Sequence, residues 1–439
     1  LPGFVRAEFQ AFSRCGILSH GFARFECAKC RHNHLVAFSY KRRGFCPSCG
    51  GRRMTARAAH LVDNVLPKVP IRQWVLSMPI RVRYLMAYDS VFCSKILNIF
   101  KREVFRWYRR RAKGQDRFES IKDAHCGSVT FIQRGGSALN LNVHFHMLAL
   151  DGVYLHEGWN RPPRFIALPP PGNVDVERVV RCIRKRVIKI LDKQDGENDE
   201  LSEREPLLAA CVAGSLTNRV ATGTKAGAAT SVIRQAELIR PHSNEKSSRC
   251  ANVDYFSLHA NTRVGAGERK RLEKLCRYVA RPPISNELLE ELSDGRIAYK
   301  LKRPWQDGTA AVVFEPAELL ERMAALVPPP RVHQVRYHGV LASASSLRSF
   351  VVVSGKSRVE NSQNECWSEL MKRAFELDVL ECPRCLGTMR LIACIMERDA
   401  IRAILGSMGL PADSPDFAPS QFIPQREFDF ENEWEWGAA

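Results

Sequence analysis

Runs of apolar residues with two different spacings predict a chain built from both strands and helices. In the first half of the chain, strand-like runs occupy three segments, at residues 71–79, 127–133 and 140–150. The segment 134–140 between the last two is rich in turn formers, which predicts a hairpin. Helical spacing predicts three long helices, over residues 86–113, 175–192 and 267–280. These elements do not alternate with the regular spacing of βαβ units, and their order indicates an α+β fold.

Composition divides the chain of 439 residues into three predicted segments. The first 60 residues contain eleven Lys and Arg, two acidic residues and five of the 15 cysteines, with little helical patterning. Three consecutive prolines at 328–330 mark a second boundary. We therefore expect a cysteine-rich domain at 1–60, a main domain at 61–327 and a C-terminal accessory region at 328–439. The last residues, 426–436, have the composition of a disordered acidic extension.

The charge balance indicates a polyanionic partner. Lys and Arg number 66 against 47 Asp and Glu, which gives a net charge of +19. Nucleic acid is a better match than a membrane surface, because the chain has no long basic amphipathic anchor. The apolar runs are far shorter than the roughly 20 residues of a spanning helix, so we expect no membrane segment. Clustered Cys-x-x-Cys pairs favour bound metal in a reducing compartment over disulfides.

Two Cys-x-x-Cys pairs in the first segment predict a zinc ribbon. The four cysteines are Cys27, Cys30, Cys46 and Cys49, with fifteen residues between the pairs. Four thiolates complete a tetrahedral shell with no open position, which makes the site structural. Other potential ligands lie nearby, and we expect them to be bystanders: Cys15, His20, His32 and His34. The arginines around the second pair, among them Arg43, Arg52 and Arg53, suit contacts with a phosphate backbone.

The strand at 140–150 carries a pair of histidines on one face. Period two places His144 and His146 together with Asn142, while Val143, Phe145 and Met147 face the other side. Two imidazoles about 6–7 Å apart along a strand suit two adjacent ligands of one divalent cation. On its own, His-x-His is a weak signal, and two histidines packed in a core are the better interpretation of it.

The predicted helix at 267–280 places a tyrosine among cations. Helical spacing puts Tyr278 on the same side as Arg271, Lys274 and Arg281, and an apolar set on the packed side: Leu272, Leu275, Cys276 and Val279. Nearby positive charge favours the phenolate, which makes this tyrosine a candidate nucleophile. A packing tyrosine whose hydroxyl reaches solvent fits the same pattern.

Several blocks of sequence, in order, resemble the rolling-circle insertion-sequence transposases of the IS91 type. The resemblance runs from about Cys15 to Ala393 and is carried by the blocks at residues 22–30, 43–49, 71–79, 139–146, 275–283 and 379–385. The last block contains a late pair, Cys382 and Cys385, whose role the sequence leaves open. Leu386 stands directly after that pair, where a glycine would suit the turn.

This resemblance implies an N-terminal zinc-binding domain followed by an HUH endonuclease, an antiparallel sheet with flanking helices. It implies that His144 and His146 bind Mg²⁺ or Mn²⁺, with Gln133 of the preceding strand as our expected third ligand, and that Tyr278 attacks single-stranded DNA at the element ends. The intermediate would be a 5′-phosphotyrosine link. Family members with two tyrosines have them four residues apart; here Lys274 and Pro282 occupy those positions, so the chain matches the single-tyrosine form.

The same resemblance extends to the DNA contacts and the location. We expect phosphate contacts from Lys274, Arg277 and Arg281 on the tyrosine helix, in addition to the arginines of the cysteine-rich domain. We expect a bacterial cytoplasmic protein associated with the nucleoid. Two other functions stay open: a replication initiator or relaxase with the same chemistry, and a non-enzymatic zinc-ribbon protein that binds DNA.

Overall fold

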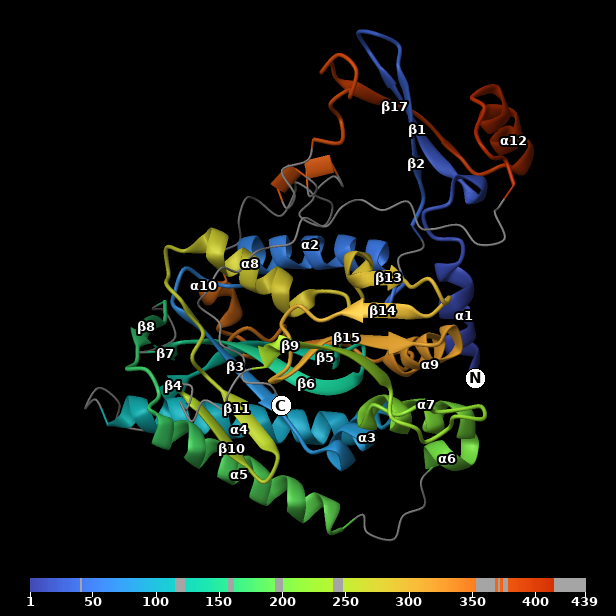
Figure 1. Cartoon of the computed structure of the whole chain (residues 1–439). Coiled ribbons are helices and arrows are strands. Elements are labelled where there is room, and N and C mark those ends of the chain that lie inside the picture. The colour runs from blue at the N-terminus through green and yellow to red at the C-terminus, as the bar shows by residue number, and fades with distance from the viewer. Residues whose placement is uncertain are drawn as a thin grey trace.

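The computed structural model describes most of the chain, and its centre is an antiparallel sheet (Figure 1). The described residues are 1–39, 42–114, 123–156, 162–193, 200–239, 248–352, 368–369, 372–373 and 378–413. The central sheet has the strand order β10-β11-β3-β6-β5-β16, and β12 also pairs with β3. The strands are β3 (Ile71–Ser77), β5 (Gly127–Gly135), β6 (Leu141–Leu150), β10 (Cys250–Val253), β11 (Phe256–His259), β12 (Arg263–Val264) and β16 (Val335–Gly339). The predicted hairpin of β5 and β6 is confirmed, as is the α+β class.

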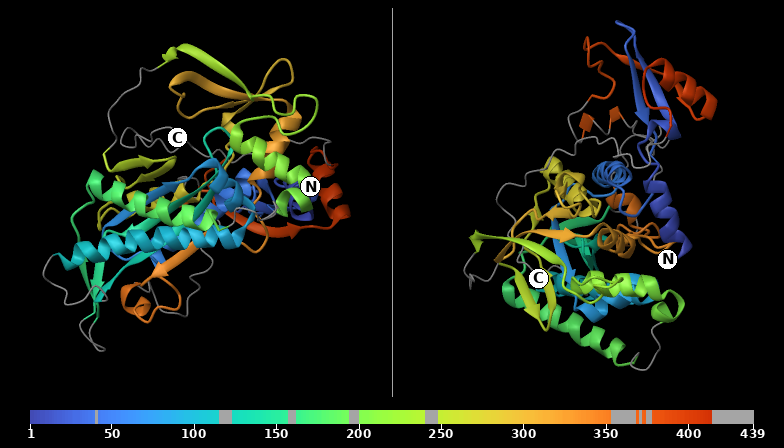
Figure 2. Two further views of the ribbon diagram at one scale, coloured as in Figure 1. Left: turned by 90° about the horizontal axis from the view of Figure 1, so that it is seen from below. Right: turned by 45° about the vertical axis from the view of Figure 1, so that its right-hand side comes forward.

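Helices cover both faces of this sheet, and the views in Figures 1 and 2 agree on the layers. One face is covered by α3 (Ile80–Tyr88), α4 (Ser90–Lys113) and α5 (Asn173–Leu191). The other face is covered by α2 (Pro47–Asn64) and α8 (Arg269–Ala280). Alternate residues of β6 enter the two cores: Phe145 packs on the α4 side and Leu148 on the α2–α8 side. A strand buried on both faces holds its side chains in fixed positions.

A small separate sheet, which we call the head, is formed by one early and one late segment of the described chain. It is a sheet of strand order β17-β1-β2, made by β1 (Phe22–Cys27), β2 (Asn33–Ala37) and β17 (Met389–Ile395). Phe22 is fully buried against Ile401 and Leu405 of α12 (Arg398–Ser407). Figure 1 shows the head above α2, with the early strands in blue and the late segments in red. The helix α1 (Gly3–Phe12) and the short η1 (Leu18–His20) precede its first strand.

The remaining elements form two peripheral sheets and their helices. The strand order β13-β14-β15-β9 is made by β13 (Leu289–Glu291), β14 (Ile297–Lys300), β15 (Asp307–Phe314) and β9 (Ser231–Ile239). The strands β4 (Ala124–His125), β7 (Gly152–Leu155) and β8 (Arg164–Ala167) form the other sheet. The short helices are α6 (Glu200–Arg204), α7 (Pro206–Thr217), α9 (Pro316–Leu326), α10 (Arg348–Val351) and η3 (Asn286–Leu288). None of the helices in the described residues is long and apolar enough to cross a membrane.

The chain crosses both of the domain boundaries expected from composition. Helix α2 runs through residue 60, and the first segment contains α1 as well, so the expectation of little helix there was wrong. Beyond residue 327, β16 pairs with β5 in the central sheet and β17 pairs with β1 in the head. Prolines end a local element but do not prevent the chain from returning to an earlier sheet. The acidic stretch 426–436 lies outside the described residues.

A buried ion pair links the central sheet to α4. The Asp151 carboxylate accepts hydrogen bonds from Arg72 Nε at 2.8 Å and Nη2 at 2.9 Å, and from Arg263 Nε at 3.1 Å. Tyr108 of α4 donates its hydroxyl to Asp151 at 3.2 Å. Arg72 and Asp151 are 1 % and 2 % exposed, so each charge depends on the other for its compensation.

Replacing Asp151 with alanine should destabilise the protein by about 3–5 kcal/mol, because Arg72 would keep a buried charge without its counter-ion. The matched control is Glu177→Ala, which breaks an exposed i,i+4 pair with Arg181 and should cost about 0.5 kcal/mol or less. Denaturant unfolding of both variants measures the difference. Equal losses of stability in the two would contradict a structural role for the buried pair.

Candidate active site and cysteine clusters

The histidines of β6 lie side by side on the face covered by α2 and α8. Their ring centroids are 4.8 Å apart and their rings are roughly perpendicular, at 63°. Val143, Phe145 and Met147 are fully buried on the opposite face, as the alternating pattern predicts. The packing of these three side chains therefore holds the strand, and with it both histidines, in a fixed position.

Burial keeps both rings neutral. Desolvation lowers the pKa of His144 to about 4, and it lowers the pKa of His146 well below its ordinary value, with His144 and Arg281 contributing in the same direction. A neutral imidazole has the lone pair that a metal ion requires. At neutral pH the pair is thus available as ligands and needs no proton release.

Tyr278 lies next to this pair. Its ring centroid is 6.3 Å from that of His146, and the two rings meet edge to face. The apolar residues of α8 are buried as predicted, and the helix packs on α2 and β5. The Arg281 guanidinium lies over the Tyr278 ring, 4.3 Å from its centroid. His146 and Tyr278, which are 132 positions apart in the sequence, are therefore neighbours in the structure.

Two glutamines surround the histidines, of which only one was predicted. Gln133 lies opposite His144 in the β5–β6 register, and its Nε2 donates to the Val279 carbonyl at 2.6 Å. Gln73 of β3 is 1 % exposed, and its amide is 2.7 Å from His146 Nδ1. Sequence reasoning missed Gln73, although an amide inside the apolar run at 71–79 was a usable signal.

The Gln73 amide can orient His146 for a metal. Its Oε1 is buried and has no hydrogen-bond partner among the residues that the structure describes, whereas its Nε2 is assigned to the contact with Nδ1. Amide oxygen and nitrogen exchange places on a flip of the side chain. In the flipped form Oε1 accepts the Nδ1 proton, and Nε2 of His146 then carries the lone pair, as is usual for histidine ligands of metals.

The predicted DNA-contacting cations differ in their exposure. Lys274 of α8 and Arg281, directly after the helix, are exposed. In the first segment Arg43 and Arg52 are exposed and Arg53 is half-buried. Arg277 is 6 % exposed and lies 3.9 Å from Glu273, one helical turn away. Its predicted contact with phosphate is therefore corrected: this cation faces the interior and forms an ion pair there.

The cysteines group differently from the predicted ribbon. Cys27 and Cys30 lie with Cys382 and Cys385, and within this group all four sulfurs are within 4.8 Å of one another. Cys46 and Cys49 lie instead with Cys15, with Cys15 Sγ at 3.5 Å from each of the other two. The expected site of Cys27, Cys30, Cys46 and Cys49 is not formed, because β1 ends in the head while Cys46 and Cys49 begin α2. Cys15, expected to be a bystander, belongs to the second group.

Leu386 after the late pair has the backbone conformation that its position suggested. Its φ is +57° and its side chain is 74 % exposed. The Leu386 N–H donates to the Cys382 carbonyl at 2.9 Å and the Cys382 N–H donates to the Gly387 carbonyl at 2.7 Å, so Leu386 lies within a closed turn. A left-handed residue other than glycine costs about 1–2 kcal/mol.

Leu386→Gly should raise the stability by about 0.5–1 kcal/mol, because relief of this strain exceeds the added freedom of the unfolded chain. Met396→Gly is the control, since Met396 is also 74 % exposed but is not among the residues with positive φ. Thermal unfolding in the presence of Zn²⁺ compares the two. A loss of stability for both would argue against strain at Leu386.

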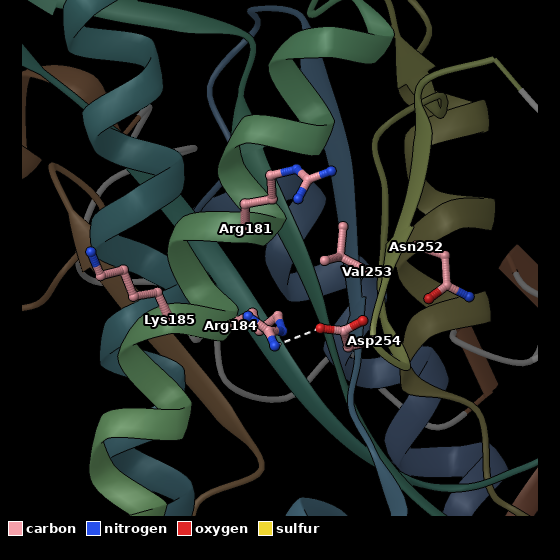
Figure 3. A pocket seen from close by; sticks show the side chains of 6 residues that line it. All are labelled: Arg181, Arg184, Lys185, Asn252, Val253 and Asp254. Carbon is pink, nitrogen blue, oxygen red and sulfur yellow. Dashed lines mark ion pairs between the residues drawn. The ribbon is translucent and has the colours of Figure 1, made fainter.

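A hollow elsewhere on the surface is lined mainly by charged and polar residues. It lies between α5 and β10, on the face opposite the histidines, and Figure 3 shows the residues that line it: Arg181, Arg184, Lys185, Asn252, Val253 and Asp254. Arg184 pairs with Asp254 at 2.5 Å, and Arg181 pairs with Glu177 at 2.6 Å. These carboxylates offset much of its positive charge.

Comparisons with known protein families match both main parts of the chain. A family model described as "Putative transposase" matches residues 127–348, about half of the chain. A model of the IS91 transposase zinc-binding domain matches residues 1–78. No curated protein and no solved structure matches the chain. The first match contains β5, β6 and α8, and the second contains Cys15, Cys27, Cys30, Cys46 and Cys49.

Proposed function

The chain belongs to the IS91-type transposases, with an N-terminal zinc-binding domain, and we propose that it nicks and rejoins single-stranded DNA through Tyr278 in rolling-circle transposition. The substrate would be one DNA strand at an end of the insertion sequence. The observation that carries this proposal is the edge-to-face contact of Tyr278 with His146, one of a neutral histidine pair. A packing tyrosine alone would not require two histidines beside it.

The chemistry is a transesterification at phosphorus. The Tyr278 oxygen forms a bond to the phosphorus while the bond from phosphorus to the 3′-oxygen breaks. The tyrosine loses its proton and the departing 3′-oxygen gains one, which leaves a 3′-hydroxyl and a 5′-phosphotyrosine. Attack by a 3′-hydroxyl reverses the step, so rejoining needs no nucleotide cofactor.

The donor set beside Tyr278 fits a divalent cation. His144 and His146 supply two imidazole nitrogens, and Gln133 has an amide oxygen that its bond to Val279 does not use. Imidazole donors suit Mn²⁺ better than Mg²⁺, which prefers oxygen. A cation bound there would polarise the scissile phosphate. Gln73 would act as a positioning residue for the His146 ring.

The exposed cations of α8 offer a path for the DNA backbone. Lys274 lies one turn from Tyr278 and is exposed, and Arg281 stacks on the Tyr278 ring with its charge near the histidine face. Lys274 and Arg281, each within about one helical turn of Tyr278, would contact the phosphates that flank the cleaved bond. The net charge of +19 provides attraction over a longer range.

Lys274→Ala should reduce the salt dependence of single-strand binding, with the log–log slope less steep by roughly 0.7, the value for one phosphate contact. Lys189→Ala is the matched control, because Lys189 is also exposed but lies on α5, on the other side of the sheet. Fluorescence anisotropy across a salt series measures both slopes. An unchanged slope for Lys274→Ala would place the DNA elsewhere.

Label transfer tests the proposed function. A single-stranded oligonucleotide from an element end, labelled on the 3′ side of the cut, is incubated with the protein and Mn²⁺. The label should migrate with the protein on a denaturing gel, and EDTA should prevent the transfer. Binding without transfer would indicate a non-enzymatic DNA-binding protein. Transfer from a replication origin but not from an element end would indicate an initiator.

A further inference from the structure

The late cysteine pair lies beside the first pair, although 352 residues separate Cys30 from Cys382 in the sequence. Cys27 Sγ is 3.5 Å from Cys385 Sγ, and Cys30 Sγ is 3.6 Å from Cys382 Sγ. Zinc–sulfur bonds of 2.3 Å place the sulfurs of a tetrahedron about 3.8 Å apart. A disulfide needs about 2.05 Å, so these distances match a shared metal ion and not a covalent link.

The backbone around these sulfurs is arranged as for bound thiolates. The N–H groups of Lys29 and Cys30 point at Cys27 Sγ, at 3.4 and 3.5 Å. At Gly387 an added Cβ would lie 3.2 Å from the sulfurs of both Cys27 and Cys385. A side chain at this position would crowd both sulfurs, so the turn approaches the cluster closely.

Strand pairing holds the two halves of the cluster in register. Cys27, the last residue of β1, lies opposite Met389, the first residue of β17, and the Ala28 N–H donates to the Thr388 carbonyl at 3.0 Å. The apolar core here is small, with Cys27, Cys382 and Met389 as its buried members. Without the late segment, β1 and β2 would be an isolated two-stranded hairpin, which is at best marginally stable.

We propose that Cys27, Cys30, Cys382 and Cys385 bind one zinc ion, and that this ion fastens the segment 378–413 to the N-terminal hairpin. The zinc-binding domain is then assembled from both ends of the described chain. Four thiolates leave no open coordination position, so the role is structural. Loss of zinc should release β17 and α12 from the hairpin of β1 and β2, because the ion contributes folding energy that the small core lacks.

Zinc content of double variants tests which pairs share an ion. In the full-length chain, Cys27→Ser with Cys30→Ser should lose one equivalent, and so should Cys382→Ser with Cys385→Ser. Combining all four changes should lose no more than either pair alone. The matched comparison is Cys46→Ser with Cys49→Ser, which should not remove the equivalent that the changes at Cys27 and Cys30 remove.

The opposite pattern would overturn the proposal. If the Cys382 and Cys385 variant retains all its zinc, or if the Cys46 and Cys49 changes remove the same equivalent as those at Cys27 and Cys30, the ribbon of adjacent pairs is the true site. This readout does not involve DNA cleavage. The result therefore does not depend on whether Tyr278 is the nucleophile.

Alkylation of the unmodified protein avoids the risk that a variant fails to fold. In the zinc-loaded chain, Cys30 and Cys385 should resist iodoacetamide, although the structure leaves Cys30 exposed and Cys385 partly exposed. A chelator should make the four cysteines reactive together. Cys394 of β17 is exposed but belongs to neither group, so it should react in both states. Reaction of Cys385 in the loaded protein at the rate of Cys394 would contradict the shared site.

Discussion

Tyr278→Phe should abolish the covalent protein–DNA adduct while DNA binding and metal binding persist. The change removes only the hydroxyl oxygen, which is the atom that bonds to phosphorus. The phenyl ring still fills the same space against His146 and beneath Arg281. We expect adduct formation to fall below detection and single-strand affinity to change less than about twofold. Denaturing gels with a labelled strand, together with anisotropy, measure the two effects.

Tyr299→Phe is the control for this experiment. Tyr299 on β14 is the next candidate nucleophile along the sequence, but it is 4 % exposed, and burial raises its pKa to about 12. Both properties disfavour attack on DNA. The Tyr299→Phe variant should therefore form the adduct normally. An adduct in Tyr278→Phe that disappears in Tyr299→Phe would transfer the role to Tyr299.

Replacing His144 and His146 together with alanine should slow cleavage by orders of magnitude, because the cation that offsets charge on the phosphate would lose two ligands. Tyr278 would remain in place. The histidine and tyrosine variants should differ in their response to metal. Raised Mn²⁺ should partly restore cleavage by a single histidine variant but should not restore cleavage by Tyr278→Phe. Single-turnover cleavage across a Mn²⁺ series measures this difference.

His338→Ala is the matched control for the histidine variant. His338 is on β16 of the same sheet, and burial lowers its pKa to about 4, like that of His144. Lys101 of α4 acts on its charge, so it faces the layer opposite Tyr278. This variant should cleave at the normal rate. Equal losses of cleavage in both variants would mean that the histidines of β6 serve the fold alone.

The local chemistry of the site was predictable from sequence because it depends on short-range spacing. Period two along residues 141–150 separated the histidine face from the apolar face, and helical spacing separated Tyr278 from the packed residues of its helix. The contact between the two elements required the resemblance to a family, since no spacing rule relates positions 146 and 278. Gln73 lay within a predicted strand, but its place beside His146 follows from the pairing of β3 with β6.

The cysteine grouping could not be predicted for a related reason. Adjacent Cys-x-x-Cys pairs are the usual way to close a zinc site, and fifteen residues are enough to do so. Here β1 pairs with a strand that follows more than 350 residues later, and this brings the late pair to Cys27 and Cys30. The interior position of Arg277 could not be predicted either. Helical spacing does not show that Glu273 and Arg373 lie near it inside the protein.

Mass-spectrometric mapping of the covalent adduct tests the central claim most directly. The protein is reacted with a single-stranded element end and Mn²⁺, the DNA is trimmed with nuclease, and the tryptic peptides are sequenced. We predict that a nucleotide remnant is attached through its 5′-phosphate to the tyrosine oxygen of Tyr278, and that EDTA in the reaction prevents the formation of this product. A remnant on any other residue, or no adduct on a strand that is nevertheless cut, would contradict the account.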